Sequence, residues 1–418
     1  MAKLNIVRVN QLAWYGDTEL ELQFPQSWEI NVCNMRGCSA PPLSDEQIKQ
    51  AFANPIGTKQ IRELAQGKKE VVIIFDDITR PTKVFQLVPH VLKELQEAGI
   101  QDGKIRFIAA LGAHGAMKRM EFAKKLGEEV ISRFDTYNHN CYANCTYLGQ
   151  TSRGTPVNIN SEVMACDLKI SISGICPHPR AGFSGGAKAI LPGVSHIDSI
   201  RANHLGNLAM VPINPDHSSH RPINSPVIDK VDNNAVRLDM EEIARMAGLD
   251  FSINVVFNGK RNPSGLFVGD VVAAHRRAVK FAREMYATPP SNNVDIVILN
   301  NYSKPSEPLV IDFNFKSLLK GDGGILVIIA NAPDGQVTHY LLGDFGKSTR
   351  QSTLPPGVNK IIMLTEYPEA TVSSKLGPPQ SIFMVKTWSE VINLLRVDHN
   401  SKAKVAVFPD VALQLLSE

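Results

Sequence analysis

The sequence predicts an α/β protein of two domains, with a largely parallel sheet in the N-terminal domain. Three short, mostly apolar runs at 70–75, 104–111 and 167–174 are typical of buried strands in such a sheet. Helical patterns separate these runs, and strands that alternate with helices favour parallel pairing. A polar loop containing Gly, Pro, His or Arg follows each run, at the position where parallel sheets bind their ligands.

Local patterns predict the elements around this sheet. Apolar and polar residues alternate over 19–24, which indicates a half-buried strand near the N-terminus. Helical periodicity extends over 44–67, with Ser44 as the N-cap. A further helix is expected over 82–98, after the first of the three buried strands.

A domain boundary is expected near residue 290. A helical stretch at 270–286 leads into a Pro-Pro-Ser-Asn-Asn run that is typical of a linker, and a new strand begins at 294–299. We expect the active site in the cleft between the domains, because domain interfaces often hold ligand pockets. The predicted divisions are an N-terminal cofactor-binding and catalytic domain at 1–270, a helical linker at 271–290, and a C-terminal α/β domain at 291–418 that closes over the substrate.

Composition argues against several classes of protein. The 418 residues are 43% hydrophobic and 20% charged, which is typical of a globular protein. Lys and Arg number 44 against 41 Asp and Glu, and no basic run stands out, so there is no electrostatic footprint for nucleic acid. No apolar run approaches the roughly 18 residues of a membrane span, and the N-terminus lacks the apolar core of a signal peptide. We therefore expect a cytoplasmic protein that binds neither nucleic acid nor membrane.

The six cysteines are few for a chain of this length. Cys141 and Cys145 form a C-x3-C pair, whereas structural zinc sites repeat C-x2-C. We expect free, partly buried thiols.

The richest candidate site is the loop at 177–193, after the third predicted strand. Three glycines, a serine and Lys188 lie close together there, and glycines let successive backbone N–H groups approach an anion. A lysine in such a loop suggests phosphate contact or an activated amine. The loop is not a Walker A motif, because Ala187 separates Gly186 from Lys188 and Ala189 follows, which leaves no hydroxyl for magnesium. The plain alternative is a flexible surface loop.

Histidines form the second signal. His114 follows the second predicted strand and His178 follows the third. Two histidines after different strands of one sheet could face one pocket from opposite sides and serve as acid and base near neutral pH. Each of them alone could also be a solvated bystander. His204, in an Arg-Ala-Asn-His segment, could be a metal ligand.

The third signal is the segment Asp76-Asp77-Ile-Thr-Arg80-Pro after the first predicted strand. The forked guanidinium of an arginine suits carboxylate or phosphate recognition. The neighbouring acids could orient Arg80 or the ribose of a cofactor. A helix N-cap and a surface ion pair would explain one aspartate, but they explain the Thr-Arg-Pro sequence less well.

Together these segments resemble the nickel-pincer-nucleotide-dependent lactate racemase family of 2-hydroxyacid racemases and epimerases. The resemblance spans nearly the whole chain and is carried by the motifs DDITRP, LGAHG, PHPRAGFSGGAKAILPG and RANH, of which the third is highly specific. It implies that Lys188 covalently holds a pyridinium-3,5-bisthiocarboxylic acid mononucleotide that carries nickel, with His204 as a nickel ligand. It also implies proteins that synthesise the cofactor as partners.

The resemblance further implies roles for the polar loops. His114 and His178 fall on the acid/base pair of the family, and Arg80 falls on its substrate-facing arginine. One histidine would take the hydroxyl proton of a 2-hydroxyacid while its C2 hydrogen leaves as hydride, and the planar keto acid would take hydride back on its other face. The remaining positions that we expect to bind the cofactor are Asp77, Thr79, Ser184, Gly185 and Gly186.

The C-terminal domain departs from the family pattern. The lactate-specific members carry a Gln and a Lys that face the substrate at its start, but Lys304, Lys316 and Lys320 do not align cleanly with that role. The substrate is therefore expected to be a 2-hydroxyacid that is not necessarily lactate. Two alternatives from other classes stay open: a zinc-dependent hydrolase or lyase with His178 and His204 as ligands and His114 as base, and a non-catalytic nucleotide-binding protein.

Overall fold

The computed structural model describes residues 5–206, 228–307, 313–321, 323–342, 353–369, 371–372 and 376–417. The protein is a mixed α/β structure with largely parallel sheets, as predicted. Its described residues group into two compact units: unit 1 comprises 5–38 and the described part of 285–417, and unit 2 comprises 39–206 and 228–284. Within the described ranges, no helix has the length and apolar character needed to cross a membrane.

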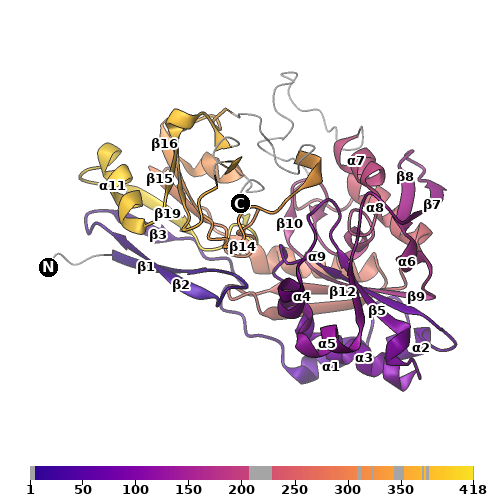
Figure 1. Ribbon diagram of the computed structural model, residues 1–418. Coiled ribbons are helices and arrows are strands. Elements are labelled where there is room, and N and C mark those ends of the chain that lie inside the picture. Colours follow the sequence, from indigo (N-terminus) through magenta and orange to yellow (C-terminus); the bar gives the residue numbers. More distant parts are fainter. Residues whose placement is uncertain are drawn as a thin grey trace. The chain divides into compact units, whose positions relative to one another are not determined.

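Unit 2 is built on a six-stranded sheet with the order β13-β12-β9-β4-β5-β6 (Figure 1). All neighbouring strands pair in parallel except β12 and β13, which are antiparallel. The three predicted strands, β4, β5 and β9, lie side by side in it, and every residue of β4 and β9 is buried. The strands are β4 (Val71–Asp76), β5 (Ile105–Ala110), β6 (Asp135–Asn138), β9 (Leu168–Gly174), β12 (Phe251–Phe257) and β13 (Pro263–Gly269).

The helices of unit 2 confirm the predicted N-cap but shorten two predicted helices. Ser44 accepts from the backbone N of Gln47, and the Gln47 side chain accepts from the Ser44 backbone in return. The expected helix at 44–67 is two helices, because Pro55 and Gly57 interrupt it, the latter with φ +70°. The expected helix at 82–98 begins with a 3₁₀ turn. The elements are α1 (Asp45–Ala53), α2 (Ile61–Leu64), η1 (Val84–Gln86), α3 (Val88–Glu97), η2 (Asp102–Lys104), α4 (Arg119–Leu126), α5 (Glu128–Arg133), α6 (Ser161–Met164), η3 (Gly186–Ala189), α7 (Ile197–Leu205), α8 (Ala235–Met246) and α9 (Ala273–Tyr286).

Two small antiparallel pairs complete unit 2. β7 (Cys145–Gln150) pairs with β8 (Pro156–Asn160), and β10 (Pro177–His178) pairs with β11 (Gly182–Phe183). The second pair lies in the glycine-rich loop and turns His178 back toward the segment that follows it. The six cysteines of the chain are free thiols, and four of them are buried.

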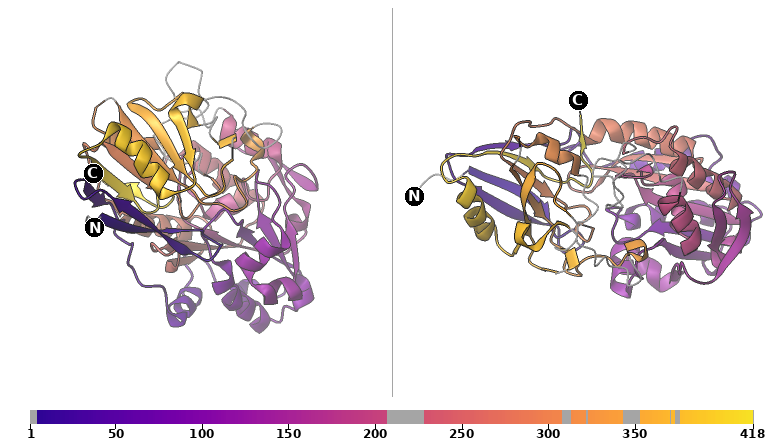
Figure 2. Two further views of the ribbon diagram at one scale, coloured as in Figure 1. Left: turned by 60° about the vertical axis from the view of Figure 1, so that its left-hand side comes forward. Right: turned by 90° about the horizontal axis from the view of Figure 1, so that it is seen from above.

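Unit 1 contains a second six-stranded sheet, all parallel, with the order β18-β17-β16-β15-β19-β3. The hairpin of β1 and β2 and helix α11 cover one face of it, where Phe24 packs against Trp388 (Figure 2). The elements are β1 (Asn5–Gln11), β2 (Thr18–Phe24), β3 (Glu29–Val32), β14 (Ala287–Thr288), β15 (Ile296–Asn300), η6 (Phe313–Leu318), β16 (Gly324–Ile329), η7 (Tyr340–Leu342), β17 (Val358–Leu364), η8 (Pro379–Ser381), β18 (Ile382–Val385), α11 (Trp388–Asp398), β19 (Lys404–Phe408) and β20 (Leu415–Leu416).

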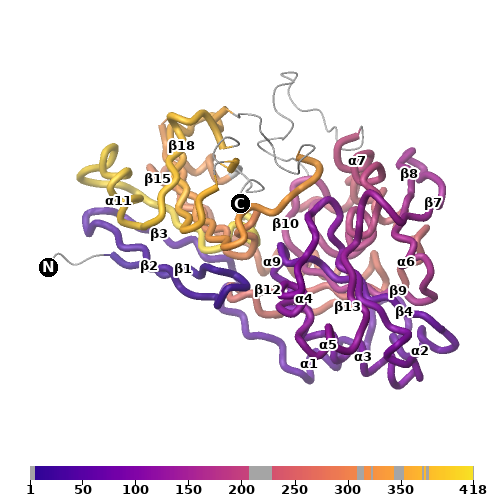
Figure 3. The backbone as a smooth tube through the Cα atoms, in the orientation of Figure 1, coloured from indigo at the N-terminus to yellow at the C-terminus, as the bar shows by residue number. Residues whose placement is uncertain are grey.

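The first strands of the chain belong with its last ones. β3, from the segment that the sequence assigns to the N-terminal domain, pairs in parallel with β19. The backbone trace shows the indigo N-terminal strands beside the orange and yellow elements of unit 1 (Figure 3). No local pattern indicates such a long-range pairing, because it depends on a shared core: the partly buried Ile30 of β3 packs against the cluster that contains Val405 and Val407 of β19. The predicted limits 1–270, 271–290 and 291–418, and the cleft between them, stay a prediction.

Candidate active site

The three polar loops that the sequence singles out, one after each predicted buried strand, lie at one edge of the unit 2 sheet. They leave the carboxyl ends of β4, β5 and β9, which are neighbouring strands. Parallel sheets bind ligands at this edge. The residues predicted from separate parts of the sequence are therefore brought to one side of one sheet.

His114 and Asp77 form a buried pair at this edge. The Nδ1 atom of His114 lies 2.6 Å from the Oδ2 atom of Asp77, and both side chains are almost entirely buried. The other carboxylate oxygen of Asp77 accepts from the backbone N of Thr79 at 2.8 Å and from its hydroxyl at 2.5 Å. The hydroxyl of Thr79 in turn accepts from Arg80 at 2.8 Å. Because Asp77 engages Nδ1, His114 would exchange a proton with a substrate through Nε2.

The charge state of Asp77 follows from these contacts. Burial is the largest single influence on its pKa and would raise it. The His114 imidazole, the Arg80 guanidinium and the Thr79 hydroxyl together outweigh burial, so the pKa of Asp77 lies well below its usual range. An ionised Asp77 that accepts at Nδ1 fixes the orientation of the His114 ring.

Asp76 differs from its neighbour, because its hydrogen bonds hold the fold together. One carboxylate oxygen accepts from the Lys125 ammonium at 2.6 Å, and the other accepts from the Thr82 hydroxyl and the Gly174 backbone N. Lys125 is fully buried, and burial lowers its pKa. Asp76 thereby joins the end of β4 to the end of β9, which positions the loops that follow.

Lys188, His178 and His204 form a second group. The Nζ atom of Lys188 lies 3.5 Å from the Nε2 atom of His178. The Nδ1 atom of His178 accepts from the backbone N of Arg180 and of Ala181, so the proton of a neutral ring lies on Nε2, next to the lysine amine. The rings of His178 and His204 lie edge to face, with centroids 6.1 Å apart. An amine and two imidazoles therefore gather at one point.

The glycines before Lys188 let the backbone pass through a crowded space. Gly185 and Gly186 have φ of +81° and +58°. A Cβ on Gly185 would lie 2.5 Å from Ile175, and one on Gly186 would lie 3.0 Å from the His275 ring. Any other residue at either position would be strained and would clash.

Ser184 secures the same segment to the end of β9. Its hydroxyl donates to the Gly174 carbonyl at 2.5 Å and accepts from the Cys176 backbone N at 2.8 Å. The backbone N of Gly186 donates to the Asn254 side chain at 2.9 Å. These hydrogen bonds of Ser184 and Gly186 are made with the protein itself, and the expected role of both residues in cofactor binding stays a prediction.

The two groups of side chains are joined by their backbones. Gly112, in the loop that carries His114, donates its N–H to the Gly193 carbonyl, at the end of the loop that carries Lys188. A Cβ on Gly112 would lie 3.0 Å from Pro192. The loops after β5 and β9 therefore touch within unit 2.

Comparison with known proteins identifies the family. The family model of the lactate racemase N-terminal domain matches residues 15–212. Lactate racemase from Thermoanaerobacterium thermosaccharolyticum is 30% identical over 435 residues, which cover 95% of this chain and 96% of that protein. Lactate racemase from Lactiplantibacillus plantarum is 32% identical over 398 residues, covering 87% and 89%. The chain belongs to the lactate racemase family. The resemblance inferred from the motifs is thereby confirmed, and the family is one of isomerases.

Solved structures show the same fold as this lactate racemase family member. The lactate racemase apoprotein from Thermoanaerobacterium thermosaccharolyticum superposes with a TM-score of 0.74 at 24% identity, covering 99% of this chain and 100% of that one. A protein from Thermotoga maritima superposes with a TM-score of 0.62 at 18% identity, covering 90% and 99%. At these identities the likeness concerns the fold alone.

The candidate residues fit a lysine-tethered group that carries a metal. The Lys188 amine stands where a covalent bond could form, and the His204 imidazole neighbours it through His178. Across the described ranges, no three His, Cys, Asp or Glu side chains form a group that could hold a metal.

The lysines considered in the C-terminal part lie in unit 1. Lys304 is buried in the loop after β15, where its backbone carbonyl accepts from the Asn301 side chain. Lys316 lies in η6, and burial lowers its pKa. Lys320 is exposed, and its backbone N donates to Val294. None of them is assigned to the substrate by these contacts.

Sequence reasoning missed three buried residues that hold the Lys188 segment. Arg237 of α8 donates to backbone carbonyls of the segment, Asn254 of β12 accepts from Gly186, and the Nε2 atom of His275 lies 2.9 Å from the Ser184 carbonyl. Burial lowers the pKa of His275 well below its usual range, so its ring is neutral and donates to that carbonyl. The available signal was an arginine on the apolar face of an amphipathic helix, three residues before Met240.

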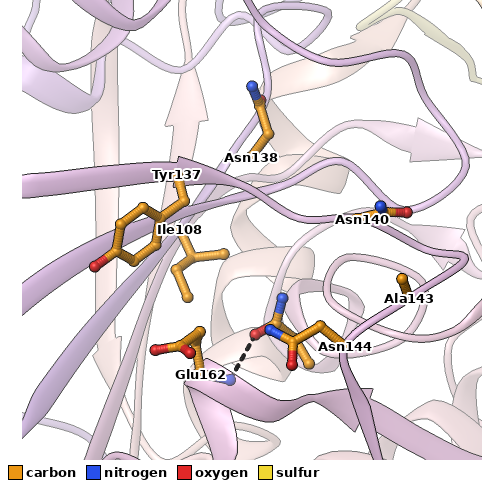
Figure 4. A pocket seen from close by; sticks show the side chains of 8 residues that line it. Ile108, Tyr137, Asn138, Asn140, Ala143, Asn144 and Glu162 are labelled. Atoms are coloured by element: carbon orange, nitrogen blue, oxygen red, sulfur yellow. Dashed lines mark hydrogen bonds between the residues drawn. The ribbon is translucent and has the colours of Figure 1, made fainter.

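A surface pocket elsewhere in unit 2 contains none of the predicted site residues. Figure 4 shows it, a hollow of about 380 Å³ beside β5 and β6. Asn138 hydrogen-bonds the backbone of Met117, and Asn160 caps α6. Glu162 receives a hydrogen bond from Arg106. These polar groups therefore hold the local fold together.

Proposed function

We propose that the protein is a racemase or epimerase of a 2-hydroxycarboxylic acid, with a nickel-pincer pyridinium mononucleotide held covalently on Lys188. The observation that supports it most is the grouping of Lys188, His178 and His204, together with the buried His114–Asp77 pair on a loop that hydrogen-bonds to the loop of Lys188. In this arrangement Lys188 would anchor the cofactor and His204 would ligate its nickel. Its partners would be the small-molecule substrate and the proteins that synthesise the cofactor.

The chemistry explains why two histidines are required. Loss of the C2 hydrogen as a proton would leave a carbanion beside a carboxylate, which is a very unfavourable species. The bound cofactor supplies an acceptor for that hydrogen as hydride. Arg80 would hold the substrate carboxylate with its forked guanidinium. His114 would take the hydroxyl proton of one enantiomer and return a proton to the keto oxygen in the reverse reaction.

His178 would do the same for the other enantiomer. A planar 2-keto acid can be attacked from either face, so a base on each side makes both configurations accessible. Asp77, Thr79, Ser184, Gly185 and Gly186 are proposed to line the cofactor. Because the lysines of unit 1 match no lactate-specific pattern, the side chain of the 2-hydroxyacid is left to experiment.

The test is expression with the cofactor-synthesis proteins and nickel, followed by intact-mass measurement and a screen of chiral 2-hydroxyacids and aldonic acids. We expect added mass on Lys188 and inversion at C2 of at least one acid. The Lys188→Ala variant should gain no mass. A parent protein that stays at its unmodified mass and binds zinc instead would contradict the proposal in favour of hydrolase or lyase chemistry.

A further inference from the structure

We propose that helix α8 sets the position of Lys188 relative to His204, with Arg237 and Asp239 as the positioning residues. Arg237 holds the segment that leads to Lys188, and Asp239 holds the helix that bears His204. This inference rests on the function proposed above and extends it to residues that touch neither substrate nor cofactor. Figure 1 shows α7 and α8 as neighbours in unit 2.

Arg237 binds the backbone of the glycine-rich segment at 181–185. Its guanidinium donates to the carbonyls of Ala181 at 3.2 Å and Gly185 at 3.1 Å, and also to that of Phe183. Three carbonyls spread over five residues are thus fixed by one planar group. A fork of donors can do this, whereas a lysine ammonium or an apolar side chain of similar size cannot.

The start of α8 makes the same connection with a second side chain. Asn234, the N-cap of α8, accepts from the Arg237 backbone N and donates to the Arg180 carbonyl at 2.9 Å. The backbone of Gly182 lies so close to the Lys230 carbonyl that a Cβ would overlap it. The segment before Lys188 is therefore seated on the N-terminal end of α8.

Asp239 ties α8 to the helix that carries His204. Its carboxylate accepts from the Asn203 side chain at 2.7 Å, and Asn203 immediately precedes His204 in α7. The same carboxylate accepts from the hydroxyls of Thr151 at 2.7 Å and Thr155 at 2.8 Å. Asp239 and Asn203 are both fully buried, so these hydrogen bonds are made without competition from water.

The burial of Arg237 argues that its position matters more than its contribution to stability. Its side chain is among the largest that are fully buried, and burial lowers its pKa to about 9. Burying a charge is unfavourable, and an apolar side chain of similar volume is often at least as stable in such a place. What the guanidinium adds is a fixed geometry for three carbonyls. Misplacement of a reacting group by about 1 Å can lower a rate by about 10²-fold.

The two residues predict two separable defects. Arg237→Met removes the donors with little change in volume, and we expect covalent mass on Lys188 to fall about 10-fold or more. Asp239→Asn places an amide N–H opposite three donors, and we expect covalent mass as in the parent but nickel retention lowered about 10- to 100-fold. Loss of stability alone would lower mass and nickel together.

The experiment expresses both variants with the cofactor-synthesis proteins and measures intact mass, nickel content and the melting temperature. Glu242→Gln is the matched control, because Glu242 lies on the same helix and its hydrogen bonds to described residues are with Ser152 and Arg153. It should keep both mass and nickel. Arg237→Lys retains the charge without the fork, and it should load as poorly as Arg237→Met.

A second measurement uses the protein without cofactor. A small acylating reagent is applied to the native chain, and labelling of Lys188 is compared with that of the exposed Lys280. The ratio should change several-fold in Arg237→Met and stay constant in Glu242→Gln. A parent that gains no mass would contradict the proposed function, while this labelling ratio still tests the positioning. The inference would be overturned if Arg237→Met matched the parent in covalent mass and in the labelling ratio of Lys188. It would also be overturned if Arg237→Met and Asp239→Asn both lost covalent mass and nickel in parallel.

Discussion

The two units carry sheets of the same kind but different chemistry at their carboxyl edges. Each sheet has six strands, mostly parallel, with polar loops after the strands. In unit 2 those loops present titratable side chains in pairs, such as His114 with Asp77 and His178 with Lys188. In unit 1 the amides of Asn300 and Asn331 stand at the ends of β15 and β16, and Asp410 after β19 accepts from Ser303. Asn300 donates to the carbonyls of Asn10 and Pro409, which joins the loop after β15 to its neighbours.

The difference shows that the edge of a parallel sheet offers a place for a site without defining it. Asn331 in unit 1 donates to Gln11 and accepts from the backbone of Glu366, so its amide is used in linking loops. In unit 2, by contrast, Asp76 and Ser184 make structural hydrogen bonds, while Asp77 contacts His114 and Lys188 lies next to His178. Function is thus a property of particular loop residues on a common framework.

The largest effect is expected at Lys188. The Lys188→Ala variant should lose all covalent cofactor and all racemisation, because it removes the amine proposed as the attachment point, next to His178. Its melting temperature should stay close to that of the parent, since a half-buried loop lysine adds little to a core. Intact mass, chiral chromatography and thermal denaturation measure the three quantities. Cofactor mass retained by the variant would place the attachment elsewhere.

The histidine pair should show the next largest effect. Replacing either His114 or His178 by Ala should slow racemisation in both directions by about 10² to 10⁴, the usual contribution of a general acid or base. The half-reactions should differ, because each variant keeps the base for only one enantiomer. Single-turnover absorbance changes of the loaded cofactor with each pure enantiomer measure this. The same enantiomer preference in both variants would make one histidine a bystander.

The central strands of unit 2 and part of its site could be predicted from the sequence. Short runs of apolar and β-branched residues predict β4, β5 and β9. Lys188 and His178 lie together in the single loop that follows β9. Residue type alone could not tell Asp76 and Asp77 apart, and only the family resemblance singled out Asp77. They are adjacent and chemically identical, and only the folded chain shows that one meets Lys125 and the other His114.

Contacts between residues far apart in the chain could hardly be predicted from the sequence. Arg237 binds carbonyls of residues more than fifty positions earlier, and backbone acceptors have no sequence signature. The pairing of β3 with β19 joins the two ends of the chain, which strand patterns alone do not specify. Pro55 and Gly57 do indicate a break between two helices in 44–67, but the prediction of one helix followed the periodicity of the apolar residues instead.

A smaller effect, dependent on pH, is expected at Asp77. The low pKa of its carboxyl in the fold, against about 3.9 in an unfolded chain, means that its ionisation stabilises the fold. That contribution is complete above the unfolded pKa and is lost as the pH falls through the lower folded value. In Asp77→Asn the decline of the melting temperature below about pH 5 should therefore be less steep than in the parent. At neutral pH, kcat should fall about 10- to 100-fold, because the His114 ring is no longer oriented. An unchanged acid profile would show that Asp77 is not the ionised partner of His114.

The smallest effect on chemistry is expected in unit 1, and it is the sharpest test of the contrast between the two edges. Asn300→Ala leaves the carbonyls of Asn10 and Pro409 without a buried donor, which should lower the free energy of unfolding by about 1–3 kcal/mol. Since Asn300 is 1% exposed, no water readily replaces the lost amide. Covalent mass on Lys188 and nickel content should nevertheless match the parent, measured at a temperature where the variant is folded. If Asn300→Ala loaded as poorly as Lys188→Ala while staying folded, the amides of unit 1 would share in holding the cofactor, and the division into a chemical edge and a structural edge would fail.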